Sequence, residues 1–286
     1  MSKSSWLDRV RHLRLVVRRA VATLQAGSLQ SIFKGAGLAF EEVRHYQPGD
    51  DVRMIDWNVT ARLGHPYVKR FVEERELRIY FVLDLSGSQM IGSSHLHKRD
   101  VAAEIIALLC LAGLRQGDSL GLVTFTTGIQ KYLPPRRGIR HALRLIYESL
   151  YADPRQLGTD LNKALQFTAK IARRRSVVVV LSDFLDLNWQ GSLDRLAHRH
   201  DVYAIRTHAP LDAHLPDAGL LALNDIETGQ IRFVDSTHAL DSTSNTVVDL
   251  KKRKQLNWIP LGTQGNHVPQ LLTALRQLRK SQRAAR

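Results

Sequence analysis

The sequence predicts an α/β protein with a doubly wound, mostly parallel sheet, and three observations lead to this prediction. Continuous apolar runs of strand length, such as 79–83 and 177–181, are typical of strands that are buried on both faces of a parallel sheet. Segments with apolar residues at helical spacing separate these runs, so strands and helices alternate along the chain. The 286 residues, of which 44% are hydrophobic, are enough to bury a large core.

The elements are expected in a regular order from residue 77 onwards. Strands are predicted over 77–83, 119–125, 176–181 and 202–206, and helices over 100–116, 139–150, 161–174 and 192–198. The alternation then lapses at residues 219–235, where apolar residues alternate around a Glu-Thr-Gly-Gln turn and predict a short hairpin. A last strand near 256–261 and a helix from residue 268 complete the predicted domain.

Residues 1–75 are predicted to form a separate N-terminal region, and 76–286 the α/β domain. Apolar residues recur at three- and four-residue spacing from Leu7 to Leu24, with arginines between them, which predicts an amphipathic helix with a basic face. We expect this helix to pack on the domain, and peripheral contact with a membrane surface is the alternative. Residues 27–76 are rich in Gly, Pro and Asp, which predicts a compact, turn-rich appendage.

The basic composition suggests nucleic acid or an anionic membrane surface as a partner, but the distribution of the charge argues against a nucleic-acid partner, and we expect a cytoplasmic protein. Lys and Arg outnumber Asp and Glu by 41 to 27, which gives a net charge of +14. Much of this excess lies near the two ends, where charged runs are usually solvated faces. The single cysteine, Cys110, excludes an internal disulfide and predicts a reducing compartment. No apolar run is long enough to span a membrane and the N-terminus lacks a signal-peptide core, so we expect a cytoplasmic location.

Oxygen-bearing side chains follow two of the buried strands. Asp84, Ser86 and Ser88 come directly after the first apolar run, and Asp183 follows the run of valines. Thr159 stands just before a predicted helix. Because open α/β sheets bind ligands beyond the carboxyl ends of their strands, we expect these five side chains at one rim. Carboxylates and hydroxyls suit Mg²⁺, with Mn²⁺ or Ca²⁺ as alternatives. The alternative for the two serines is that they cap the following helix.

The pattern Asp84-x-Ser86-x-Ser88, with Thr159 and Asp183, resembles the metal-ion-dependent adhesion site of von Willebrand factor type A domains. Other motifs along the chain, including Ser182-Asp183-Phe184 and Asp225-x-Glu227-Thr228-Gly229, resemble domain-of-unknown-function family 58 (DUF58). The N-terminal part of that family signature comprises Gly35, Gly37, Arg44, Tyr46, Gly49, Asp50, Asp51, Arg53, Asp56, Trp57 and Arg62. Family members usually have Met directly after the second Ser, whereas here Gln89 precedes Met90, which makes the local loop shape uncertain.

We expect structural roles for these N-terminal signature residues. Asp50 or Asp51 is expected to cap a short helix, and binding of a metal or a partner is the alternative. The arginines are expected to pair with neighbouring aspartates, with a ligand phosphate as the alternative. Trp57 is expected in a core, and a stacking platform is the alternative.

The resemblance implies a non-catalytic protein-interaction module. In von Willebrand factor A domains an Asp or Glu of a partner protein completes the coordination of the metal, and DUF58 proteins are commonly thought to work beside MoxR-type AAA+ ATPases as adaptors or co-chaperones. Two other functions stay open. One is a metal-dependent hydrolase, for which Asp160 is the candidate general base, and the other is a basic nucleic-acid-binding protein. The sequence contains neither a P-loop nor a Gly-x-Ser-x-Gly elbow.

Overall fold

The computed structural model describes residues 14–23, 42–52, 55–70, 77–92, 96–153, 158–212, 219–224, 231–235, 256–265 and 267–284. Contacts within the chain divide it into two compact units. The larger unit is Met1–Ile32 together with Leu77–Arg286, and the smaller unit is Phe33–Glu76. The smaller unit ends one residue beyond the expected boundary after residue 75, and residues 1–32 fall in the larger unit.

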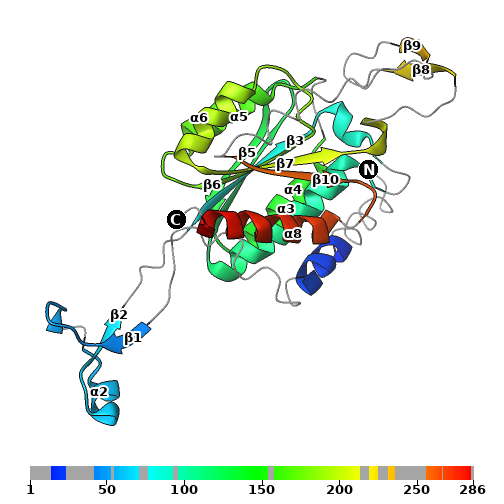
Figure 1. The fold of residues 1–286 in the computed structure, drawn as a ribbon. Coiled ribbons are helices and arrows are strands. Elements are labelled where there is room, and N and C mark those ends of the chain that lie inside the picture. Colours follow the sequence, from blue (N-terminus) through cyan, green and yellow to red (C-terminus); the bar gives the residue numbers. More distant parts are fainter. Residues whose placement is uncertain are drawn as a thin grey trace. The chain divides into compact units, whose positions relative to one another are not determined.

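A six-stranded sheet forms the centre of the larger unit (Figure 1). In spatial order its strands are β10 (Asn257–Gly262), β7 (Asp201–His208), β6 (Val177–Ser182), β3 (Arg78–Asp84), β4 (Ser119–Phe125) and β5 (Ile129–Arg136). All neighbouring pairs are parallel except β4 and β5, which are antiparallel. The connection from β3 leads to one side and the connection from β6 to the other, so the sheet is doubly wound with its switch point between β3 and β6. The predicted fold class is confirmed.

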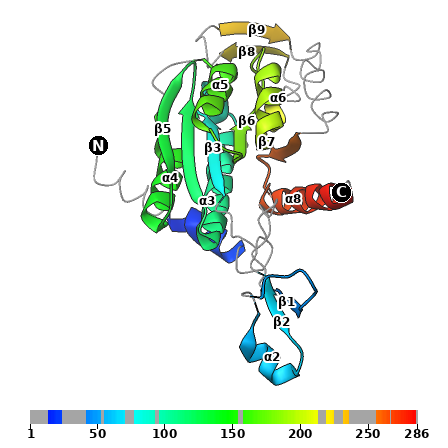
Figure 2. The same ribbon diagram turned by 90° about the vertical axis from the view of Figure 1, so that its left-hand side faces the viewer.

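Helices cover both faces of this sheet (Figures 1 and 2). On one face lie α5 (Leu161–Ile171) and α6 (Gln190–Arg199). On the other lie α3 (Lys98–Gln116), α4 (Ile139–Tyr151) and α8 (His267–Ala284). The ring of His267 in α8 contacts the carboxylate of Glu104 in α3 at 2.8 Å, which ties these two helices together. Every residue of α3 from Val101 to Gly113 is buried, as expected for a helix that is almost entirely apolar over this stretch.

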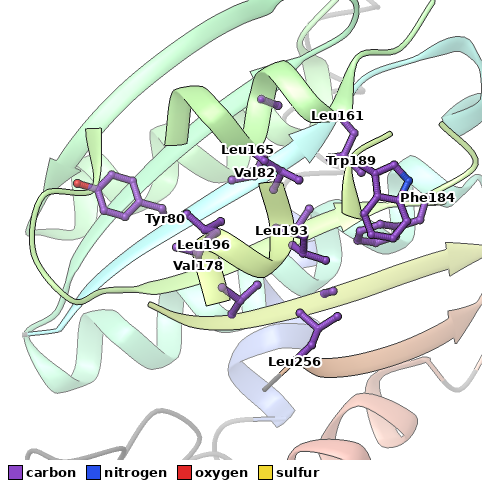
Figure 3. Close-up of a cluster of buried hydrophobic side chains, with 14 of the residues drawn as sticks. Tyr80, Val82, Leu161, Leu165, Val178, Phe184, Trp189, Leu193, Leu196 and Leu256 are labelled. Carbon is purple, nitrogen blue, oxygen red and sulfur yellow. The ribbon is translucent and has the colours of Figure 1, made fainter. Parts of the chain in front are cut away.

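The core between the sheet and α5 and α6 consists mainly of aliphatic side chains, with the rings of Tyr80, Phe184 and Trp189 among them (Figure 3). Trp189 is fully buried, and its ring packs edge-on against Phe184, with ring centroids 5.1 Å apart. Its indole N–H donates to the carbonyl of Asp186 at 2.8 Å, so the polar atom of this large side chain is satisfied. This packing fixes the segment that follows β6.

Residues 14–23 form a helix that packs on the larger unit. Its apolar residues Val16 and Ala20 are buried, and the Arg19 guanidinium lies 4.0 Å from Glu104 of α3. This agrees with the expected packing of the basic amphipathic segment. The predicted hairpin is also present, as β8 (Leu220–Asn224) pairs antiparallel with β9 (Ile231–Asp235). Within the described residues, no helix is both long and apolar enough to cross a membrane.

The smaller unit is a two-stranded antiparallel ribbon with one short helix. Strand β1 (Glu42–His45) pairs with β2 (Tyr67–Arg70), and α2 (Trp57–Leu63) lies between them in the sequence. The carboxylate of Asp56, and not that of Asp50 or Asp51, caps α2 by accepting the N–H groups of Asn58 and Val59.

Two other expectations for this unit have different outcomes. Arg44 pairs with Asp50 at 2.6 Å, as expected for the signature arginines. Trp57 is 66% exposed, so the expected core position is wrong: it stands at the start of α2, a helix with no buried residue. Gly49 has φ 109, a conformation that favours glycine. Gly35, Gly37 and Arg53 lie outside the described residues.

Candidate functional site

Two of the predicted site residues, Asp84 and Asp183, lie at the switch point of the sheet, at the carboxyl ends of β3 and β6. Asp84 is the last residue of β3 and is fully buried. One carboxylate oxygen accepts the backbone N–H of Ser86 at 2.8 Å, and the other accepts the hydroxyl of Ser182 at 2.7 Å. Because the two bonds come from different strand ends, the orientation of this carboxylate is fixed by both β3 and β6.

The two serines stand beside each other on the turn after β3. The hydroxyl oxygens of Ser86 and Ser88 are 3.0 Å apart. Ser86 precedes the short 3₁₀ helix η2 (Gly87–Met90) but makes no side-chain capping bond to it. The Ser86 side chain therefore does not make the hydrogen bond that a helix-capping role would require. The Ser86 hydroxyl interacts with the Asp84 carboxylate, and the Ser88 hydroxyl is next to that of Ser86.

Gln89 resolves the local shape that the sequence left uncertain. Its side chain is buried, and its amide oxygen accepts the hydroxyl of Thr207 in β7 at 3.1 Å. Met90 is instead 49% exposed. The inserted polar residue thus anchors η2 to the sheet, while the methionine faces outwards and the spacing of Asp84, Ser86 and Ser88 is preserved.

Asp183 comes directly after β6 and is also buried. One of its carboxylate oxygens accepts the backbone N–H of Leu185 at 3.3 Å, and the other lies 3.2 Å from the ammonium of Lys98. The next residue, Phe184, has φ 57, which is strained for an aromatic residue and is held by its packing on Trp189. This backbone turn separates the inward-packed Phe184 from the rim where Asp183 lies.

Thr159 and Asp160 lie on the loop before α5. The backbone N–H of Asp160 donates to the carbonyl of Thr126, just beyond β4, at 2.9 Å, so this loop is held at the same edge of the sheet. Thr159 is half-buried. Asp160 is the N-cap of α5: its carboxylate accepts the N–H of Lys163 at 2.8 Å and pairs with the Lys163 ammonium at 2.8 Å. Asp160 therefore already has a structural role.

The electrostatics of the site centre on Asp84. Burial, and then the negative charge of Asp183, raise its pKa to about 7, although the hydrogen bonds from Ser182 and Ser86 oppose the shift. Within the described part of the chain, no Lys or Arg pairs with Asp84, whereas Asp183 has Lys98. The donor set is thus two buried carboxylates and two hydroxyls, with one carboxylate lacking a cation. This set fits a hard divalent ion such as Mg²⁺.

Three residues of this region carried no clear signal in the sequence: Lys98, Ser182 and Asp212. Ser182 was part of a family motif but looked like an ordinary strand residue. Lys98 and Asp212 come from the start of α3 and from η3 (Pro210–Asp212), far from Asp183 in sequence. In the described residues, no cluster of three or more His, Cys, Asp or Glu side chains suits a metal ion, so any metal site here relies on hydroxyl ligands.

A mostly parallel sheet of six strands with helices on both faces is consistent with a von Willebrand factor A-like fold. The chain belongs to the family described as "Protein of unknown function DUF58", whose model matches residues 42–255. It is 36% identical over 227 residues to "Uncharacterized protein Rv1480" of Mycobacterium tuberculosis (strain ATCC 25618 / H37Rv), which covers 78% of this chain and 71% of the relative.

Two solved structures are similar in outline. The protein BatB from Bacteroides thetaiotaomicron matches with a TM-score of 0.47 and 13% identity, over 71% of this chain and 99% of that one. A von Willebrand factor type A protein from Catenulispora acidiphila matches with a TM-score of 0.35 and 14% identity, over 50% of this chain and 35% of that one. Similarities of this size carry no argument about function.

Proposed function

We propose that this protein is a non-catalytic protein-interaction module that binds Mg²⁺ at the β3–β6 switch point and, through the ion, a carboxylate of a partner protein. The observation that carries the proposal is the buried carboxylate of Asp84, which has the hydroxyls of Ser182 and Ser86 beside it, the charge of Asp183 nearby and no cation of its own in the described structure. Asp84, Ser86 and Ser88 would hold the ion together with Thr159 and Asp183. Mn²⁺ or Ca²⁺ would suit the same oxygens.

The chemistry of this set favours binding of a partner over catalysis. A bound divalent ion supplies a Lewis-acidic position that water or an incoming carboxylate can fill. Hydroxyl ligands are neutral, so two carboxylates would leave little negative charge to repel an Asp or Glu from another protein. Hydrolysis would also require a general base, and the candidate, Asp160, caps α5 and pairs with Lys163. No observation favours the hydrolase or the nucleic-acid alternative.

Exposed apolar side chains around the rim support a protein partner. Met90 follows β3, Leu185 and Leu187 follow β6, and Leu211 follows β7, and these four are between 47% and 71% exposed. Protein interfaces commonly combine an apolar surface with a central polar anchor. A partner segment that presents Asp or Glu beside apolar residues would match this arrangement.

The partner we propose is a MoxR-type AAA+ ATPase, and the location we propose is the cytoplasm. Both rest on the family resemblance and on composition. In this proposal the protein acts as an adaptor or co-chaperone, because the side chains described at the site suit recognition of a partner carboxylate.

Direct metal binding tests the first step of this proposal. Isothermal titration of the purified protein with Mg²⁺, and electron paramagnetic resonance with Mn²⁺, should detect one site that Asp84→Ala abolishes. Asp201→Ala is the matched control, because Asp201 is the first residue of β7 and lies at the amino ends of the strands, away from the site. There its carboxylate pairs with Arg175. Equal binding by wild type and Asp84→Ala would refute the assigned site.

A further inference from the structure

Lys98 places a fully buried ammonium next to the candidate metal site. It is the first residue of α3, and its side chain is 0% exposed. The ammonium lies 3.2 Å from a carboxylate oxygen of Asp183 and 2.7 Å from one of Asp212. Buried lysines are rare and need such partners, because desolvation of the ammonium is unfavourable. The shared contact links α3, the end of β6 and η3.

The charges of this buried cluster do not balance. Asp84, Asp183 and Asp212 are all buried or nearly so, and Lys98 is the cation in contact with two of them. When the three carboxylates are ionised, the cluster keeps two negative charges in excess. Arg206 is close, but its guanidinium contacts the backbone carbonyl of Asp183, at 3.2 Å, and not a carboxylate. One divalent ion would supply the missing charge.

Asp183 is the carboxylate that Lys98 and a bound ion would share. The Lys98 ammonium is farther from the Asp183 carboxylate, at 3.2 Å, than from the Asp212 carboxylate, at 2.7 Å. The second carboxylate oxygen of Asp212 accepts the backbone N–H of Ala209 at 2.8 Å. Asp212 is therefore a fixed, charged acceptor that can keep the ammonium paired without help from Asp183. An ion that takes Asp183 as a ligand would leave Lys98 on Asp212.

We propose that Lys98 is the resident cation of this site: it neutralises Asp183 when no divalent ion is bound, moves its pairing towards Asp212 when an ion binds, and thereby sets the metal affinity. This inference rests on the proposed metal site and adds the residue that sets the metal affinity of that site. Asp212 acts on the metal through Lys98, because the described side-chain bonds connect it to Lys98 and not to Asp84 or Asp183. The two residues should therefore have opposite effects.

Metal titrations of three variants test this mechanism. With Mn²⁺ and Mg²⁺ as probes at fixed pH, Lys98→Met should bind the ion tighter by roughly tenfold or more, within the range usual for coupled sites. Asp212→Asn should bind it more weakly, because Lys98 then depends on Asp183 alone. In the double variant, Asp212→Asn should have little further effect, because the ammonium through which it acts is gone. Lys131→Met is the control, since it removes a cation from the half-exposed pair with Glu148.

The outcomes separate this inference from the proposed site. Metal binding that depends on Asp84 but is unchanged in both Lys98→Met and Asp212→Asn would overturn the role of Lys98 and leave the site intact. The role of Lys98 would also be overturned if Asp212→Asn weakened metal binding equally with and without Lys98. Asp212 would then act on the metal through its charge alone and not through Lys98. Absence of binding in every variant would refute the site and the inference together. If Lys98→Met does not fold, the direction of the Asp212→Asn effect decides the question.

Discussion

Replacing Asp84 by Asn should stabilise the metal-free protein at pH 8. Burial and the neighbouring charge of Asp183 raise the pKa of Asp84 from 3.8 to about 7, so its ionised form is disfavoured in the folded state. A shift of this size corresponds to about 4 kcal/mol of unfolding free energy lost at high pH. Asn removes the charge, but its amide group faces the Ser182 hydroxyl that donates to Asp84, a loss of about 1–2 kcal/mol. The net stabilisation should be about 2–3 kcal/mol.

The sign of this effect should depend on pH. The folded protein holds a proton on Asp84 more tightly than the unfolded chain does, so the wild type gains stability as the pH falls from 8 through 7 towards 4. At pH 5 the carboxyl is already neutral in the folded protein, and most of the advantage of Asn disappears. Urea denaturation in EDTA at pH 8 and pH 5, followed by tryptophan fluorescence, measures both differences. Asp201→Asn serves as the surface control.

At pH 8, added Mg²⁺ should make the wild type more stable than Asp84→Asn, the reverse of the order in EDTA. Wild type binds the ion and gains stability by mass action, while Asp84→Asn has lost a charged ligand. Two results would refute the reasoning: a wild type at least as stable as Asp84→Asn in EDTA at pH 8, or a difference between the two proteins that is the same at both pH values.

Three further predictions concern the framework of the site. Trp189→Ala should lower the unfolding free energy by about 3–5 kcal/mol in urea denaturation, because the indole is fully buried between α6 and the sheet; a loss below about 1 kcal/mol would contradict this packing. Burial lowers the pKa of His200, so the unfolded chain takes up a proton at this residue more readily than the folded protein does. The wild type should therefore lose stability relative to His200→Phe as the pH falls from 7.5 to 5.5, through the unfolded-state pKa of 6.5. Parallel stability profiles of the two proteins over this pH range would contradict the prediction. Asn188 has φ 63, a left-handed backbone conformation, so Asn188→Val should lower the free energy of unfolding by about 1–2 kcal/mol in thermal denaturation. Asn188→Gly should change this free energy little. Equal losses in the two variants would exclude backbone strain as the cause.

Most of the sheet could be predicted because its strands are short, continuous apolar runs. The runs before Asp84 and Asp183 became β3 and β6 within a residue of their expected ends. Strand β5 was missed, because Pro134 and Pro135 interrupt its pattern. Proline is tolerated there since β5 is an edge strand with a free side. The ribbon of β1 and β2 was missed as well, because its strands are too short for a periodic signal.

The candidate site was predictable only where it follows strand ends. Asp84, Ser86 and Asp183 could be placed at one rim because parallel strands bring their carboxyl ends together. Lys98 begins the charged triplet Lys98-Arg99-Asp100, which looks solvent-exposed in the sequence, yet its ammonium is buried. Its partners are 85 and 114 residues away, and such distant pairs leave no local pattern. The exposure of Trp57 was also not predictable, because it depends on how α2 packs and not on the residue type at position 57.

The central claim is that a divalent ion at the switch point mediates binding of a partner protein. The most direct measurement is the affinity of the purified protein for a co-purified MoxR-type ATPase from the same cell, in Mg²⁺ and in EDTA, for the wild type and for Asp84→Ala/Asp183→Ala, after circular dichroism has shown that both are folded. The account predicts a complex only for the wild type in Mg²⁺. The same affinity in all four combinations would contradict it, because binding would then be independent of both the metal and its proposed ligands.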